Sequence, residues 1–171
     1  MGEIYSTFSD DTEVAVAATG RALFVIKPAS SNGVRLRSID IVGIPGVTSA
    51  PQSQTFRVRM VRGATTATIA TQGGTELGLN NLHPLGRTAV STVVKLPSTA
   101  TGSHSPTEGG ICLYSSVING AKGESWSWSS ADKPELAYWC DKSSNLSVLV
   151  HPTDTTVFSG RLVFEEMSKG S

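Results

Sequence analysis

Side chains that commonly carry enzymatic chemistry are few and scattered along this sequence. The histidines His83, His104 and His151 lack the close spacing with a carboxylate that a metal site on β-strands requires. The acidic pairs Asp10-Asp11 and Glu165-Glu166 occur in a polar terminal segment and at the end of a predicted strand, where solvated charge is the ordinary interpretation. Phosphate-binding loops, nucleophile elbows and HExxH motifs are absent from the sequence. We therefore expect no enzyme, no metal and no cofactor.

Aromatic side chains suggest a second kind of chemistry, the stacking of rings on sugars. Trp126 and Trp128 alternate with serines in one predicted strand, and Tyr138 and Trp139 follow in the next. Exposed on a β-sandwich, such rings would form a carbohydrate-binding platform, whereas in the interior they would dominate the core. We expect Trp126 and Trp128 to fill the core. Because neighbouring residues of a strand face opposite sides, we expect one of Tyr138 and Trp139 to be exposed or to lie at a subunit interface.

Arginines form a third candidate site. Arg35 and Arg37 alternate in one predicted strand. Arg57 and Arg59 do the same in another, and both pairs would share one sheet face if these two strands pair. Such a stripe would bind an acidic protein surface, or residues 1–20 of a neighbouring copy, which contain four acidic residues and no basic one. The equal alternative is a solvated outer face without a partner.

Strands must position these groups, because helix-period patterns are missing. Residues 54–62 alternate between apolar and polar side chains, which predicts a half-buried strand. Over residues 34–42 the alternation changes phase, which predicts a bulge or bend near Ser38. We predict eight to ten strands, over about residues 22–27, 34–42, 54–62, 66–70, 90–96, 111–118, 124–129, 135–140, 146–150 and 160–166. This pattern indicates an all-β, antiparallel sandwich or barrel, and two four-stranded sheets of a jelly roll suit the number of strands.

The length of 171 residues fits one domain. We expect a single β-sandwich domain over residues 21–171, preceded by an extended N-terminal arm over residues 1–20. The arm is acidic and holds few apolar residues, so we expect it to be ordered by docking on another protein chain. The expected partner-binding residues of the arm are Ile4, Tyr5, Phe8, Asp10 and Asp11. Their acidic members would pair with the arginine stripe of a neighbouring copy.

Charge and targeting features limit the partners. Fourteen basic and fourteen acidic residues give a net charge of zero, which argues against a nucleic-acid-binding protein. No stretch is long and apolar enough for a transmembrane helix, and the N-terminus lacks the pattern of a signal peptide. We therefore expect neither nucleic acid nor a membrane as a partner, and synthesis in a cytoplasm. In that compartment Cys112 and Cys140 are expected to be buried, unbridged thiols.

The order of several segments resembles that of small virion proteins of tailed bacteriophages. The segments that carry the resemblance are Val34–Ile41, Phe56–Arg62, Trp126 before Pro134-Glu135, and Gly160–Glu166. The resemblance spans about residues 20–167 and consists of strand patterns. It implies a jelly-roll capsid accessory protein, a cement or decoration protein that sits between major capsid subunits, often as a homotrimer. It also implies a place on the capsid surface of a virion made in a host cytoplasm, and it transfers no catalytic residues.

Two functions from different classes therefore remain at this point. The first is a virion structural protein that binds the major capsid protein and stabilises the shell, because many weak contacts with a repeating lattice add up to firm attachment. The alternative is a carbohydrate- or receptor-binding β-sandwich module of a phage tail or a similar assembly.

Overall fold

The computed structural model describes residues 2–14, 21–29, 32–45, 55–64, 75–83, 86–95, 111–119, 125–129, 139–140 and 145–168. All regular elements in these ranges are strands, and every strand pair is antiparallel. The all-β prediction is confirmed. The strand expected over residues 66–70 lies outside the described residues.

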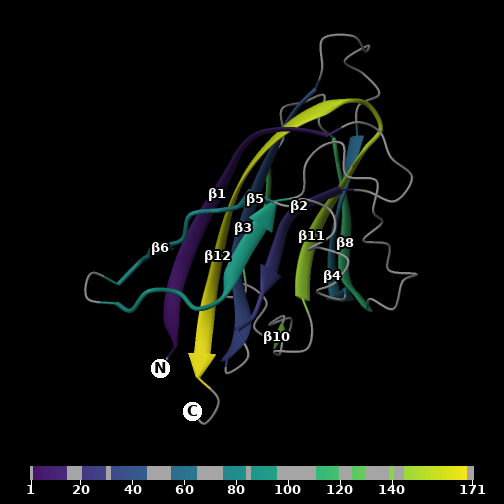
Figure 1. Ribbon diagram of the computed structural model, residues 1–171. Coiled ribbons are helices and arrows are strands. Elements are labelled where there is room, and N and C mark those ends of the chain that lie inside the picture. Colours follow the sequence, from purple (N-terminus) through teal and green to yellow (C-terminus); the bar gives the residue numbers. More distant parts are fainter. Residues whose placement is uncertain are drawn as a thin grey trace.

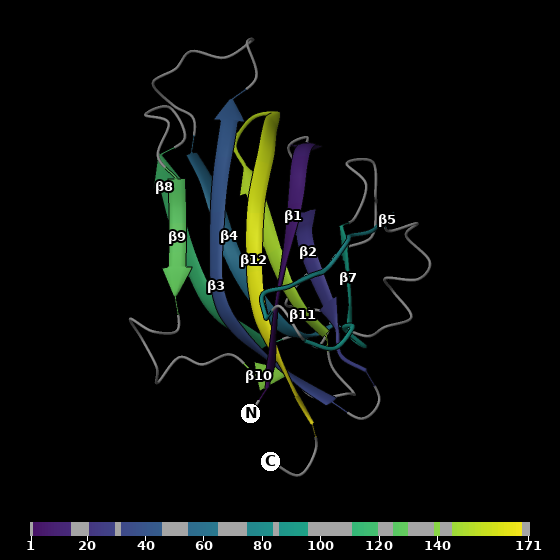
Figure 2. The same cartoon turned by 90° about the vertical axis from the view of Figure 1, so that its left-hand side faces the viewer.

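The first sheet contains both ends of the described chain. Its four main strands follow the order β1-β12-β3-β9, and short strands β6 and β10 add to β1 and β3 (Figure 2). The bounds are β1 (Glu3–Val14), β3 (Asn32–Pro45), β6 (Asn80–Asn81), β9 (Ser125–Ser129), β10 (Trp139–Cys140) and β12 (Thr156–Ser168). The C-terminal strand β12 therefore lies between the first and third strands of the chain.

The second sheet packs against the first. Its main strands follow the order β2-β11-β4-β8, and β7 and β5 extend it beyond β2. The bounds are β2 (Arg21–Lys27), β4 (Thr55–Ala64), β5 (Thr75–Glu76), β7 (Thr92–Lys95), β8 (Ile111–Asn119) and β11 (Asn145–Pro152). Two sheets with these strand orders form an eight-stranded jelly roll, as the sequence predicted.

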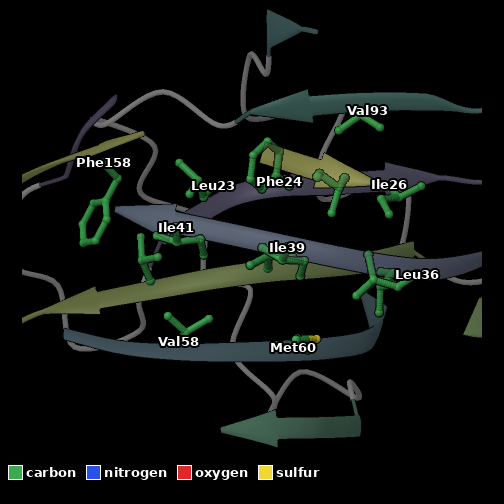
Figure 3. Packing of buried hydrophobic residues seen from close by; sticks show 14 of the residues in the cluster. Leu23, Phe24, Ile26, Leu36, Ile39, Ile41, Val58, Met60, Val93 and Phe158 are labelled. Carbon is green, nitrogen blue, oxygen red and sulfur yellow. The ribbon is translucent and has the colours of Figure 1, made fainter. Parts of the chain in front are cut away.

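Apolar side chains from both sheets fill the space between them. Figure 3 shows residues of β2, β3 and β4 pointing into this layer, among them the fully buried Phe24, Ile39 and Met60. The ring of Phe56 on β4 meets the ring of Phe158 on β12 edge to face, with 5.1 Å between the ring centroids. These contacts join strands of opposite sheets, and burial of such apolar surface is the main stabilising term of the fold.

The predicted phase change in β3 is a β-bulge. Leu36 pairs with Phe164 and Ser38 pairs with Val163, so Arg37 is the extra residue opposite β12. The bulge turns both apolar phases of β3 toward the core, and four side chains become fully buried. They are Val34, Leu36, Ile39 and Ile41.

The expectation of an N-terminal arm is wrong for residues 3–14. These residues form β1, which pairs with β12 along most of its length (Figure 1). Tyr5 is only 1% exposed and its ring lies 5.7 Å from that of Phe164, so Tyr5 is a core residue and not an anchor for another chain. The acidic residues that suggested an arm are accommodated because β1 bulges at Asp10 and Asp11, opposite Ser159.

The expectation of a single arginine face is also wrong. Arg35 and Arg37 lie on β3 in the first sheet, whereas Arg57 and Arg59 lie on β4 in the second. In both strands the neighbouring apolar residues face the core, so the two pairs lie on opposite outer faces of the sandwich.

The tryptophans and cysteines are described only in part. The register pairs Trp126 with Ile41 and Trp128 with Ile39, both core residues, while the tryptophan side chains lie outside the described residues. Tyr138 also lies outside them, and of Trp139 only its backbone pairing with β3 is described. Cys112 is exposed on β8, so its predicted burial is wrong, because β8 is the last strand of its sheet. The side chain of Cys140 is not among those described.

Tyr5→Ala should lower the free energy of unfolding by about 3–5 kcal/mol, because it empties a buried ring site in the core. Phe8→Ala is the matched control on the same strand, where the ring is 49% exposed and the loss should stay within about 1 kcal/mol. Urea denaturation of the three proteins measures both values. Equal, small losses would show that β1 is not part of the core.

Candidate functional site

Residues 76–83 and 86–91, which we call the crossing segment, cover the β1 edge of the first sheet. The segment leaves β5 in the second sheet, crosses to β1 at β6 and returns to β7 (Figure 1). The Leu82 N–H donates to the Ile4 carbonyl at 2.9 Å, and the Thr7 hydroxyl donates to the Gly78 carbonyl at 2.8 Å. These bonds fasten the crossing segment to β1 and link the two sheets along one side.

The Arg87 carbonyl is the centre of a hydrogen-bond network in this segment. The Tyr5 hydroxyl donates to it at 3.0 Å and the Asn81 side-chain amide at 2.7 Å. Asn81 also accepts a hydrogen bond from the His83 N–H at 2.7 Å. A Cβ at Gly86 would come within 2.0 Å of the Asn81 side-chain amide, so a larger residue there would displace Asn81 from this network.

Tyr5 supplies its proton to this network because its phenol stays protonated. Burial raises the pKa of Tyr5, and the negative charges of Glu166 and Glu3 raise it further. The Tyr5 hydroxyl therefore acts as a donor that holds the crossing segment.

Two buried carboxylates fasten the end of β12. Glu166 is 6% exposed and accepts hydrogen bonds from the N–H groups of Val90, at 3.2 Å, and Ser91, at 2.5 Å. Glu165 is 7% exposed and forms an ion pair with Arg37, the bulge residue of β3. The interpretation of Glu165 and Glu166 as solvated strand-end charges is wrong, because each binds a different part of the chain.

Two hollows flank the Tyr5–Arg87 contact. The first has a volume of about 410 Å³ and is lined mainly by the crossing segment. The second has a volume of about 350 Å³ and is lined by Glu3, Asn32 and Glu166 as well. Tyr5 and Glu166 already use their polar groups in internal hydrogen bonds, and the residues described around the hollows include no histidine or cysteine that could act as a base or nucleophile.

Metal-binding and membrane-spanning features were also sought in the described ranges. Within them, no group of three or more His, Cys, Asp or Glu side chains gathers in a way that could hold a metal ion. They also contain no helix long and apolar enough to cross a membrane.

The outer face of the first sheet carries a row of side chains that crosses four strands. Register places Phe8, Arg161, Asp40 and Ser127 side by side on β1, β12, β3 and β9. The Arg161 guanidinium carbon lies 5.8 Å from the Phe8 ring centroid, and the Ser127 hydroxyl donates to Asp40 at 2.8 Å. Phe8 is 49% and Val42 41% exposed on this face. We call these five residues the Phe8 face.

The outer face of the second sheet carries positive charge. Arg57 pairs with His151 across β4 and β11, and Arg59 pairs with Leu149 one step along. Strands β2, β4, β8 and β11 contain no acidic residue. Within the described part of the chain, the buried Arg59 Nε and His151 Nε2 atoms have no hydrogen-bond partner. We call Arg57, Arg59 and His151 the cationic face.

His151 is neutral near pH 7 in this environment. Burial lowers its pKa from 6.5 to about 4, and the positive charges of Arg59 and Arg57 contribute to the shift. A neutral imidazole keeps one N–H donor and one acceptor on the cationic face.

The residues expected to bind a partner are thus distributed over several environments. Phe8 and Asp10 are exposed on β1, Ile4 is half-buried, and Tyr5 is in the core. Asp11 lies at the β1 bulge, and its side chain is not among those described. The four-strand row was not predicted from the sequence, although alternation along β12 puts Arg161 on the opposite face from Leu162 and so indicates that Arg161 faces outward.

Comparisons with known proteins give a distant structural similarity. No protein-family model matches the chain, and no curated protein sequence matches it. Among solved structures, a chain of Cocksfoot mottle virus is similar, with a TM-score of 0.30, 11% sequence identity, and coverage of 98% of this chain and 83% of that chain. At this level of similarity the jelly-roll assignment rests on the strand order alone.

Glu166→Ala should lower the free energy of unfolding by about 3 kcal/mol, because two buried N–H groups lose a charged acceptor. Amide hydrogen exchange at Val90 and Ser91 should accelerate together with this loss. Glu76→Ala, at an exposed position at the start of the crossing segment, should change stability by less than about 0.5 kcal/mol. Unchanged exchange at both amides would contradict the role of Glu166.

His151 should make stability depend on pH. Its folded pKa of about 4 lies below the unfolded value of 6.5, so protons bind the unfolded chain more tightly between these values. The stability that neutral His151 provides is complete above pH 6.5 and is lost as pH falls toward 4. His151→Asn should remove this component from the difference between the two stability curves. An imidazole titration near 6.5 by NMR would refute the assignment.

Proposed function

We propose that this chain is a structural protein of a virus particle, a cement or decoration protein that binds between major capsid subunits and stabilises the shell. The observation that carries the proposal is a jelly roll with a filled core whose large exposed apolar side chains include Phe8 and Val42 on one outer sheet face. A fold arranged in this way presents rigid surfaces to other proteins.

The Phe8 face has the composition of a protein-binding surface. An aromatic ring under an arginine, on a face that also exposes Val42 two strands away, resembles the anchors that supply most of the energy in protein interfaces. The face lies on four hydrogen-bonded strands, so its side chains lose little freedom on binding. Phe8 therefore keeps the anchoring role expected from the sequence, whereas Tyr5 does not share it.

Shell binding also agrees with the lack of a catalytic base or nucleophile around the two hollows in the described residues. The two hollows lie along the crossing segment. The polar side chains that line them largely form the hydrogen bonds that hold this segment in place. A surface that binds a repeating lattice gains strength from the number of copies, so each contact can be weak. We propose a homotrimer as the unit that binds, with the major capsid protein as its partner and the capsid surface as its location.

Particles purified from the source test this proposal. Quantitative mass spectrometry should find the chain in a fixed ratio to the major capsid protein. Phe8→Ser, supplied in place of the natural chain, should reduce this occupancy at least about fivefold through loss of an aromatic anchor. Val90→Ser is the matched control, because Val90 is 56% exposed and lies in the crossing segment, outside the Phe8 face and the cationic face.

Two results would contradict the proposal. The first is a chain that is absent from purified particles. The second is a chain whose Phe8→Ser variant attaches normally while soluble oligosaccharides quench its tryptophan fluorescence, which would favour the carbohydrate-binding alternative.

A further inference from the structure

The two sheets carry opposite net charges. The strands of the first sheet contain seven acidic and three basic residues, a net charge of −4. Those of the second sheet contain six basic residues and one acidic residue, a net charge of +5. The chain as a whole has no net charge. Its positive and negative side chains are therefore distributed unequally between the two sheets. Each layer is therefore complementary to the opposite layer of another copy.

Arg57 carries the positive charge of the cationic face that a partner could reach. Its side chain is exposed, whereas Arg59 and the neutral His151 lie beside it at partly buried positions. An incoming carboxylate would gain from the charge of the Arg57 guanidinium and from hydrogen bonds to it.

The negative charge is concentrated in β1. The bulge opposite Ser159 places Asp10 and Asp11 in succession, and the Asp10 side chain is exposed. Phe8 is exposed two residues away on the same strand. The bulge thus offers a carboxylate beside an apolar side chain.

These two regions cannot meet within one chain. Val58 and Met60, which alternate with Arg57 and Arg59 along β4, are buried in the core between the sheets. The two arginines therefore point away from the first sheet, to which β1 belongs. An acidic bulge that reaches the cationic face must come from a second molecule.

We propose that the cationic face of one copy binds the acidic β1 bulge of the next copy in a head-to-tail contact. This inference rests on the proposed function for its setting. It adds to that function by naming what binds the outer face of the second sheet. A head-to-tail contact uses two different surfaces, so it leaves one of each free until a ring closes. Closure after three copies would give the trimer proposed above.

Exposed single-charge reversals test the contact in the full chain. Arg57→Glu and Asp10→Lys should each weaken self-association about tenfold in sedimentation velocity, because each replaces attraction with repulsion. Lys27→Glu is the matched control. It changes the charge of the second sheet by the same amount as Arg57→Glu, at the end of β2 that lies away from Arg57 and His151. The wild-type association should also weaken between about 0.05 M and about 1 M salt.

Mixing the two reversed variants gives the sharpest test. The reversed face of Arg57→Glu is complementary to the reversed bulge of Asp10→Lys, and the remaining surfaces are natural partners. An equimolar mixture should therefore recover the association that neither variant shows alone. Circular dichroism melts must show that both variants and the Lys27→Glu control remain folded.

Three results would overturn the inference. They are a wild-type chain that stays monomeric, a mixture that does not recover association, and an Arg57→Glu variant that self-associates normally but loses binding to a single-stranded DNA oligonucleotide. The third result would show that the cationic face serves nucleic acid instead. Attachment to particles is measured separately, so self-association without attachment would refute the proposed function and leave this contact standing.

Discussion

The pairing of the first strand with the last is the constraint on which the rest of this structure depends. β12 is the last strand of the described chain and lies between β1 and β3. It therefore hydrogen-bonds to two strands from the N-terminal part of the chain. This arrangement brings Tyr5 against Phe164 in the core and sets Phe8 beside Arg161 on the outer face. The same strand holds the crossing segment through Glu166 and the β3 bulge through Glu165. Loss of this pairing would remove the core contact, the Phe8 face and both carboxylate anchors together.

Bulges let one sequence satisfy a buried layer and a charged surface at the same time. In β3 the extra residue Arg37 reverses the alternation, so four apolar side chains reach the core while the arginine binds Glu165. In β1 the bulge places two aspartates in a strand that otherwise pairs regularly with β12. Beyond its short pairing with β6, β1 is the edge of its sheet in the described residues, and a bulged, charged edge strand resists unwanted backbone pairing.

The sequence was sufficient to predict the fold class because strand alternation is a local property. Apolar positions such as Val58 and Met60 were placed correctly, and the phase change near Ser38 correctly predicted a bulge. Long-range pairing was not predictable in the same way. The acidic composition of residues 1–20 suggested an arm, because nothing local indicates that β12 would pair with them. For the same reason a shared face for Arg35 and Arg57 could be predicted only on the condition that their strands pair, since sheet membership depends on strand order and not on alternation. The buried roles of Glu165 and Glu166 depend on partners more than 70 residues away, beyond any local pattern.

A map of the intact particle tests the central claim, that this jelly roll works through its two outer sheet faces, most directly. Cryo-electron microscopy of purified particles at a resolution that separates strands should show the chain between capsid subunits. The account predicts the Phe8 face turned toward the shell and the β1 bulge of each copy against β4 of its neighbour. A map in which both outer faces are turned to solvent, or in which the chain is missing from the shell, would contradict it.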